Sequence, residues 1–232
     1  MRKRANCSRR EFFCITSSAG AAALIRGTGS PVAAQGEPEE VSPSEDLMRE
    51  HGVLKRIMLV YEECIRRLEA KLSFDPERLS DGAGIIRQFI EGYHEKLEED
   101  PLFPRFERAG KLAELVATLR AQHAAGRRVT DLILRNAGAE LATDAKRQTV
   151  VFRALRQFNR MYAPHEARED TVLFPAFRAL VSAREYDELG DRFEAREKQL
   201  FGENGFEQIV ARVAAIEKAL GLYDLNQFTP TI

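Results

Sequence analysis

The segment HEKLEEDPLFPRF (residues 94–106) returns 71 residues later as HEAREDTVLFPAF (residues 165–177). The two copies share the initial His-Glu pair, the glutamate four residues after the histidine, the Leu-Phe-Pro triplet and the final phenylalanine. A lone histidine precedes each copy, because His51 and His123 are 72 residues apart. The sequence therefore contains two tandem units, each with a lone histidine followed by a His-x-x-x-Glu motif.

Apolar residues around these motifs recur at helical spacing. Ser42-Pro43-Ser44-Glu45 is a helix start signal, with a serine cap, a proline in the first position and a glutamate three residues after the cap. Stripes of period 3.6 predict four helices, which cover residues 47–72, 79–97, 112–133 and 143–169. No strand-like alternation of useful length occurs. Two helix pairs with short connections predict an all-α, antiparallel four-helix bundle over residues 44–181.

Residues 182–232 are expected to form a C-terminal helical extension of two further helices. Ser182-Ala183-Arg184-Glu185 is a capping box, and the stripe from Phe206 to Leu220 ends at Gly221. We interpret this extension as a structural arm. It would pack either on the bundle or on a second subunit, so a homo-oligomer is one expectation.

The four histidines of the chain, His51, His94, His123 and His165, all fall on apolar stripes. A single buried histidine is usually a hydrogen-bonded core residue, but four, one per helix, are costly to desolvate unless something binds their ring nitrogens. Residues four apart share a helix face, so Glu98 and Glu169 are expected beside His94 and His165. Four imidazoles and two carboxylates in a bundle suit a pair of borderline divalent metals such as iron. The alternative is a polar layer of His–Glu hydrogen bonds that fixes the helix register.

These residues resemble the hemerythrin-like, HHE cation-binding domain, through His51, HEKLE (94–98), His123 and HEARE (165–169). The resemblance covers roughly residues 44–180 and implies a non-haem di-iron centre in a four-helix bundle. It implies that Glu98 and Glu169 bridge two iron ions. One iron would bind His51 and His94, and the other would bind His123 and His165. The Leu-Phe-Pro segments are interpreted as apolar plugs and helix kinks beyond the site.

One departure from the resemblance concerns the third helix. Oxygen-carrying hemerythrins place a second histidine there, one turn from the first, whereas this chain has Leu119 and Arg127 at the flanking positions. Glu95 and Glu166 are candidates for an extra ligand, although we expect them to face solvent. Tyr61, Tyr93 and Tyr162 are candidate hydrogen-bond donors to the ligands, with core packing as the alternative role. Cys64 is expected to be a packing residue.

The N-terminus is expected to be a targeting segment. Six of the 35 basic residues but only one of the 36 acidic residues lie within positions 1–34. Ser8-Arg9-Arg10-Glu11-Phe12-Phe13 resembles a twin-arginine export signal, and Val32-Ala33-Ala34 offers a cleavage site. Residues 35–43 would then form a linker, and the mature protein would be periplasmic or otherwise extracytoplasmic after recognition by the twin-arginine machinery. A leader that stays in the cytoplasm, or one that remains as an anchor, is the alternative.

The remaining 29 basic and 35 acidic residues make the body mildly acidic, which argues against a nucleic-acid-binding surface. No nucleophilic triad, phosphate loop or Cys-x-x-Cys motif occurs. The favoured function is a di-iron protein that handles oxygen, peroxide or a related small molecule, as a redox enzyme or as a reversible binder. The alternative is a non-catalytic helical protein that stores or senses a metal or mediates an interaction.

Overall fold

The computed structural model describes residues 41–231 of the chain. The expected leader over residues 1–34 and most of the expected linker over residues 35–43 lie outside this range. From Pro43 onward the chain forms one compact unit. The described residues are helical with no strand, which confirms the prediction of an all-α bundle with additional C-terminal helices.

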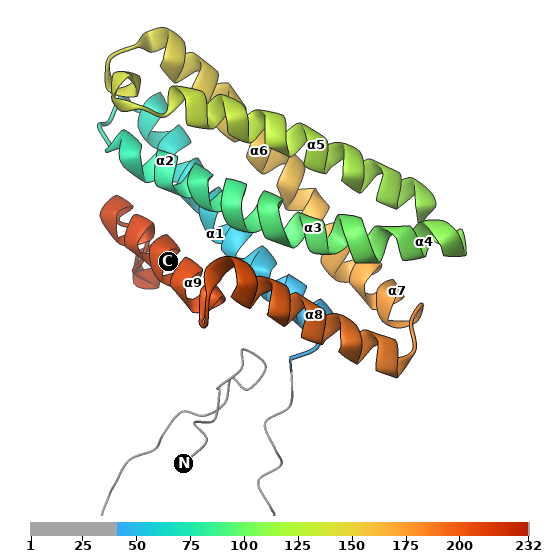
Figure 1. Cartoon of the computed structure of the whole chain (residues 1–232). Coiled ribbons are helices and arrows are strands. Elements are labelled where there is room, and N and C mark those ends of the chain that lie inside the picture. Colours follow the sequence, from blue (N-terminus) through green and yellow to red (C-terminus); the bar gives the residue numbers. More distant parts are fainter. Residues whose placement is uncertain (1–40, 232) are drawn as a thin grey trace, which may run out of the picture. The chain divides into compact units, whose positions relative to one another are not determined.

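Four long helical segments build the bundle (Figure 1). The first is α1 (Pro43–Glu69), and the third is α5 (Ala113–Asn136). The second runs through α2 (Pro76–Ile85), η1 (Ile86–His94), α3 (Glu95–Leu97), η2 (Glu98–Leu102) and α4 (Phe103–Ala109). The fourth runs through α6 (Ala145–Arg168), η4 (Glu169–Leu173) and α7 (Phe174–Arg178). A short 3₁₀ turn, η3 (Ala139–Ala142), lies between the third and fourth segments.

Side-chain caps fix where several helices begin. Asp75 accepts a hydrogen bond from the Glu77 backbone N–H just before Pro76, and Asp144 caps Lys146 and Arg147 in the same way. Ser182 accepts from the Glu185 backbone N–H, as the capping box predicts. The first helix is shorter than its stripe suggested. Leu72 lies beyond Glu69 and is half exposed, because the chain turns away before it can reach the core.

Both His-x-x-x-Glu motifs lead into π-helical turns, Glu98–Leu102 and Glu169–Leu173. Such wide turns are frequent at functional sites, because they change the direction of side chains along a helix. The following prolines, Pro104 and Pro175, lie in the first turn of α4 and α7, where a missing N–H is tolerated. The leucines and phenylalanines of the Leu-Phe-Pro segments are fully buried, as expected for plugs that close the bundle.

The C-terminal extension packs on the bundle of the same chain. It consists of α8 (Ala183–Phe201), α9 (Gly205–Leu220) and a short 3₁₀ turn, η5 (Leu225–Phe228). Figure 1 shows α8 and α9 along the side of the bundle that α1 and the second segment form. Arg56 of α1 makes a bidentate ion pair with Glu217 of α9, at 2.8 and 2.5 Å. Within residues 41–231, no helix is both long and apolar enough to span a membrane.

Candidate metal centre

The six predicted ligand side chains converge in the interior of the bundle. They come from all four helical segments: His51, His94, Glu98, His123, His165 and Glu169. Each of them is at most 4% exposed. Their potential ligand atoms form two groups, His51–His94–Glu98 and His123–His165–Glu169, within which all atoms lie inside 4.8 Å of one another. The structure thus pairs the histidines as the resemblance implies, while ligation itself stays a prediction.

Glu98 lies between the two groups. Its Oε1 is 3.6 Å from the Nε2 of His94, and its Oε2 is 3.4 Å from the Nε2 of His123. A carboxylate with one oxygen toward each group has the position that a bridging ligand requires.

Glu169 also contacts both groups, although through a single oxygen. Its Oε2 is 3.4 Å from the Nε2 of His51 and 3.1 Å from the Nε2 of His165. Each carboxylate therefore lies next to one histidine of either pair, and together the two carboxylates join the groups into one centre.

The centre contains buried polar atoms that nothing else in the described residues satisfies. Neither oxygen of Glu98 or Glu169 makes a hydrogen bond there, nor does the Nε2 of His51. Burial raises the pKa of Glu98, and the negative charge of Glu169 raises it further. Burial opposes ionisation of Glu169 too, but the adjacent imidazoles of His165 and His51, at 3.1 and 3.4 Å, hold its pKa below the usual range. Because unsatisfied buried carboxylates are costly, this donor set fits bound cations.

The outer ring nitrogens of the histidines all have partners. The Nδ1 of His51 lies 2.7 Å from Asp170, and that of His94 lies 2.7 Å from Glu50. A carboxylate next to Nδ1 holds a proton on that nitrogen, so Nε2 is the ring nitrogen that faces the centre and is available to a metal.

The other two histidines follow the same plan. The Nδ1 of His123 lies 3.1 Å from Glu99, and that of His165 lies 2.8 Å from the side-chain oxygen of Gln122. These four partners were not predicted from the sequence. The available signal was adjacency: Glu50 and Gln122 directly precede the lone histidines, whereas Glu99 and Asp170 directly follow the motif glutamates.

The four Nδ1 partners lie at equivalent positions of the two tandem units, but one of these two equivalent pairs differs in charge. Glu50 and Gln122 occupy equivalent places in the two units, so one motif histidine has an anionic partner and the other a neutral one. The lone histidines differ as well. Asp170 and Glu169 outweigh the effect of burial and raise the pKa of His51 to about 9, whereas burial lowers the pKa of His123 to about 4 in spite of Glu99. The two halves of the centre are therefore electrostatically different.

The expectation that Glu95 and Glu166 face solvent is wrong. Both are 1% exposed, because neighbouring helices cover this face and supply cations. Arg127 of α5 contacts Glu95 at 2.6 Å, and Lys55 of α1 contacts Glu166 at 3.2 Å. Burial raises the pKa of Glu95 to about 8, even though Arg127 opposes this. Arg127, which stands near the place of the absent second histidine, thus acts as an ion-pair partner.

One of the three candidate tyrosines reaches this polar shell. Tyr162 donates a hydrogen bond to the Oε1 of Glu95 at 2.7 Å, and its ring contacts His165 edge-on. The hydroxyl of Tyr93 instead donates to the Phe193 carbonyl in α8, at 3.3 Å. Tyr61 is buried against Phe158, and its hydroxyl has no hydrogen-bond partner among the described residues. Tyr162 is therefore the tyrosine that connects to the centre.

Phenylalanines of the Leu-Phe-Pro segments pack directly on the lone histidines. Phe174 stacks on His51 with ring centroids 5.5 Å apart, and Phe103 stacks on His123 at 5.6 Å. Both stacks have an interplanar angle of 22°. These rings cover the imidazoles and limit their rotation, so the Leu-Phe-Pro segments also help to orient the histidines. Cys64 is buried, as expected for a packing residue.

Comparison with known proteins agrees with this geometry. The model of the hemerythrin HHE cation binding domain matches residues 42–147. Uncharacterized proteins of Mycobacterium bovis and of two Mycobacterium tuberculosis strains (CDC 1551 and H37Rv) are each 47% identical to the chain over 223 residues. The alignment covers 93% of this chain and 88% of each relative. The chain contains a match to the hemerythrin HHE cation binding domain.

The family match and the structure complement each other. The range that matches the hemerythrin HHE domain contains His51, His94, Glu98 and His123, whereas the second motif, with His165 and Glu169, lies after it. The structure brings that motif to the same centre. The chain thus carries a cation-binding domain with two His/Glu clusters that could hold metal. No solved structure matches the chain.

Proposed function

We propose that the centre is a non-haem di-iron site that binds or reacts with oxygen, peroxide or a related small molecule. His51 and His94 would hold one iron, His123 and His165 the other, and Glu98 and Glu169 would bridge them. The observation that carries this proposal is the position of both carboxylates between the two histidine pairs. Imidazole and carboxylate ligands together suit iron.

Within such a centre the chain provides orientation and exclusion of water. The Nδ1 partners fix the tautomer of each histidine, and the stacked phenylalanines limit ring rotation. When bound, a pair of iron ions supplies electrons and open coordination positions for a small oxygen-containing ligand. The two pairs Lys55–Glu166 and Arg127–Glu95 keep additional charge close to the centre without joining the six predicted ligands.

A second candidate function is metal storage or sensing without turnover. The burial of all six side chains favours it, because the centre has little contact with solvent in this conformation. Both functions require bound metal, and they differ in whether the absorption of the centre responds to reductant and oxygen.

Metal analysis tests the proposal directly. After expression in iron-rich medium, we expect the purified chain to contain about two iron ions, because each of the two clusters provides a complete donor set. The near-ultraviolet and visible spectrum should change on reduction and recover in air if the centre handles oxygen. Zinc alone, or fewer than about one metal ion per chain, would refute the di-iron assignment, and a spectrum that ignores both treatments would favour storage or sensing.

Replacing Gln122 by glutamate should make the two metal positions more alike. The change gives His165 the anionic partner that Glu50 already provides to His94, and such partners typically alter metal affinity about 10- to 100-fold. We expect tighter binding of the weaker of the two ions in an anaerobic titration with ferrous iron. The exposed Gln157 provides a control for the same substitution outside the centre. An unchanged second binding step would show that the neutral amide does not control affinity.

We also propose that the protein is exported through the twin-arginine route. The support is the arginine pair Arg9-Arg10 before an apolar stretch, followed by the expected cleavage site at Val32-Ala33-Ala34. Export of folded protein would suit a centre assembled from four helical segments, because iron could then be inserted in the cytoplasm, away from competing copper and zinc.

A further inference from the structure

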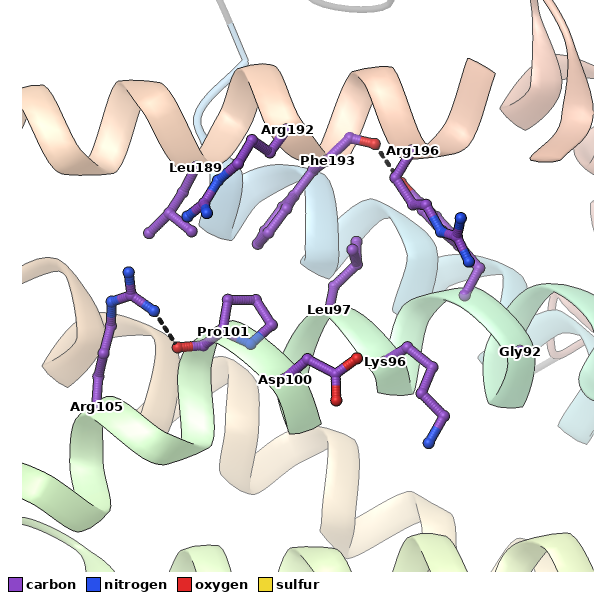
Figure 2. A pocket seen from close by; sticks show the side chains of 11 residues that line it. Gly92, Lys96, Leu97, Asp100, Pro101, Arg105, Leu189, Arg192, Phe193 and Arg196 are labelled. Carbon is purple, nitrogen blue, oxygen red and sulfur yellow. Dashed lines mark hydrogen bonds between the residues drawn. The ribbon is translucent and has the colours of Figure 1, made fainter. Parts of the chain in front are cut away.

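A cleft of about 660 Å³ lies between α8 and the second helical segment, on the outside of the metal centre. Figure 2 shows α8 as one wall and the helix from Gly92 to Arg105 as the other. We name it the α8 cleft. Its volume is in the range of sites that bind small organic molecules.

The rim of the α8 cleft is basic. Four cationic side chains line it, and Asp100 is the one acidic side chain among the lining residues. The cations are Lys96, Arg105, Arg192 and Arg196. Since charges of one sign that line a cleft focus the electrostatic field, the α8 cleft favours an anion.

Two of these cations are engaged by acidic side chains. Lys96 pairs with Glu99 at 2.5 Å, and Arg105 pairs with Glu185 at 2.7 Å. The other two stand one helical turn apart on α8. Arg196 donates to the neutral side chain of Gln199, and Arg192 makes no hydrogen bond or ion pair with the described part of the chain. The α8 wall therefore provides guanidinium groups that are not neutralised by a carboxylate.

The positions of the arginines also favour the binding of an anion. Arg105 and Arg192 lie at the same end of the cleft on opposite walls (Figure 2). Two guanidinium groups that face one space repel each other unless an anion lies between them. A guanidinium group matches the planar oxygen pair of a carboxylate or the oxygens of a phosphate or sulfonate.

The floor of the cleft is apolar. The second segment contributes Tyr93 and Leu97 to the floor, and α8 contributes Leu189 and Phe193. The two residues of each pair are one helical turn apart. All four are at most 7% exposed, so they present edges to the cleft and not an open apolar surface. A small apolar group can contact these edges while an acidic group reaches the arginines.

We infer that the α8 cleft binds a small organic anion, with its acidic group held by Arg192 at the end where Arg105 lies opposite, Arg196 adding positive charge at the other end, and an apolar body on the floor. This site is separate from the metal centre, because none of its lining residues is among the six predicted ligands. It is nevertheless linked to the centre. Lys96 lines the cleft and pairs with Glu99, whose other oxygen contacts the Nδ1 of His123.

A fluorescence titration with anilinonaphthalene sulfonate tests this inference on the full chain. The sulfonate is a poor metal ligand, so the signal reports the cleft and not the centre. We expect saturable binding to one site, and about tenfold weaker binding of the same aromatic compound without its sulfonate group. The variant Arg192→Ser/Arg196→Ser should bind the sulfonate about tenfold more weakly, because the α8 wall of the cleft then carries neither of its guanidinium groups.

A matched control removes the same charge elsewhere. Arg153 and Arg160 are exposed on α6, away from the cleft, and the double variant Arg153→Ser/Arg160→Ser should bind the probe within about twofold of the unmodified chain. All four arginines are exposed, and circular dichroism verifies that both variants are folded. Equal loss of binding in the two variants, no loss in either, or no saturable binding to the unmodified chain would overturn the inference.

Discussion

Replacing Glu98 by glutamine is expected to remove at least one metal ion per chain while it stabilises the metal-free protein. The side chain is fully buried, and the charge of Glu169 and burial both raise its pKa. A neutral amide of the same shape needs no proton uptake on folding and can donate to Glu169, which we expect to raise the free energy of unfolding by about 1–3 kcal/mol. Metal analysis and thermal unfolding measure the two effects, which have opposite signs.

The pH dependence of this stabilisation follows from the direction of the pKa shift. Between the usual pKa of a glutamate and the raised pKa of Glu98, the folded state binds the proton and the unfolded state does not, so the folded state loses stability as the pH rises. The advantage of Glu98→Gln in metal-free protein should therefore shrink as the pH falls toward the ordinary range of glutamate. An advantage that is independent of pH would contradict this origin.

Glu95→Gln is the matched control, because Glu95 is equally buried and directly follows His94. Its partners are Arg127 and Tyr162, so we expect this variant to keep about two metal ions. If both variants lost metal equally, the assignment of Glu98 as a ligand in preference to Glu95 would be wrong.

Replacing Gly126 by alanine is expected to cost about 2–4 kcal/mol of stability. A Cβ atom at this position of α5 would lie 2.0 Å from the hydroxyl oxygen of Tyr162 and 2.8 Å from the ring carbon that carries it. Tyr162 cannot move away easily, since its ring packs against Phe158 at 4.4 Å and its hydroxyl is bonded to Glu95. Urea-induced unfolding of the two proteins measures the loss.

Gly52 provides the control for this glycine substitution. It lies in the middle of α1 with no atom within 4 Å of an added Cβ, so alanine there should stabilise the helix by about 0.5–1 kcal/mol. The double variant Gly126→Ala/Tyr162→Phe should recover part of the stability, because the hydroxyl is gone but the ring remains close. Absence of any recovery would mean that the clash is not with Tyr162.

The fold and the convergence of the six side chains were predictable from the sequence because both depend on spacing within a helix. His94 and Glu98 share a face wherever their helix packs, and the repeat places a second such pair in the fourth segment. The four Nδ1 partners depend instead on the register between helices. Asp170, for example, contacts His51 on another segment 119 residues away, and no periodicity within one helix determines such a pair.

The wrong expectation for Glu95 and Glu166 has a related cause. A residue directly after a core histidine points about 100° away from it around an isolated helix, which normally means toward solvent. Here a neighbouring helix covers that side and provides Arg127 or Lys55 as a counter-ion. The π-helical turns could not be predicted either, because the apolar stripes do not distinguish a π-helical turn from an α-helical turn.

Two of the four Nδ1 contacts tie the first helix pair to the second: Asp170 of η4 contacts His51 of α1, and Glu99 of η2 contacts His123 of α5. Such cross-pair contacts have a kinetic consequence for bound ions. All six predicted ligands are buried, and contacts between the two helix pairs hold His51 and His123 in place. An ion could therefore leave only when the two helix pairs separate locally. The residence time of the metal would then be set by the rate of this opening, and the strength of the individual metal–ligand bonds would matter less.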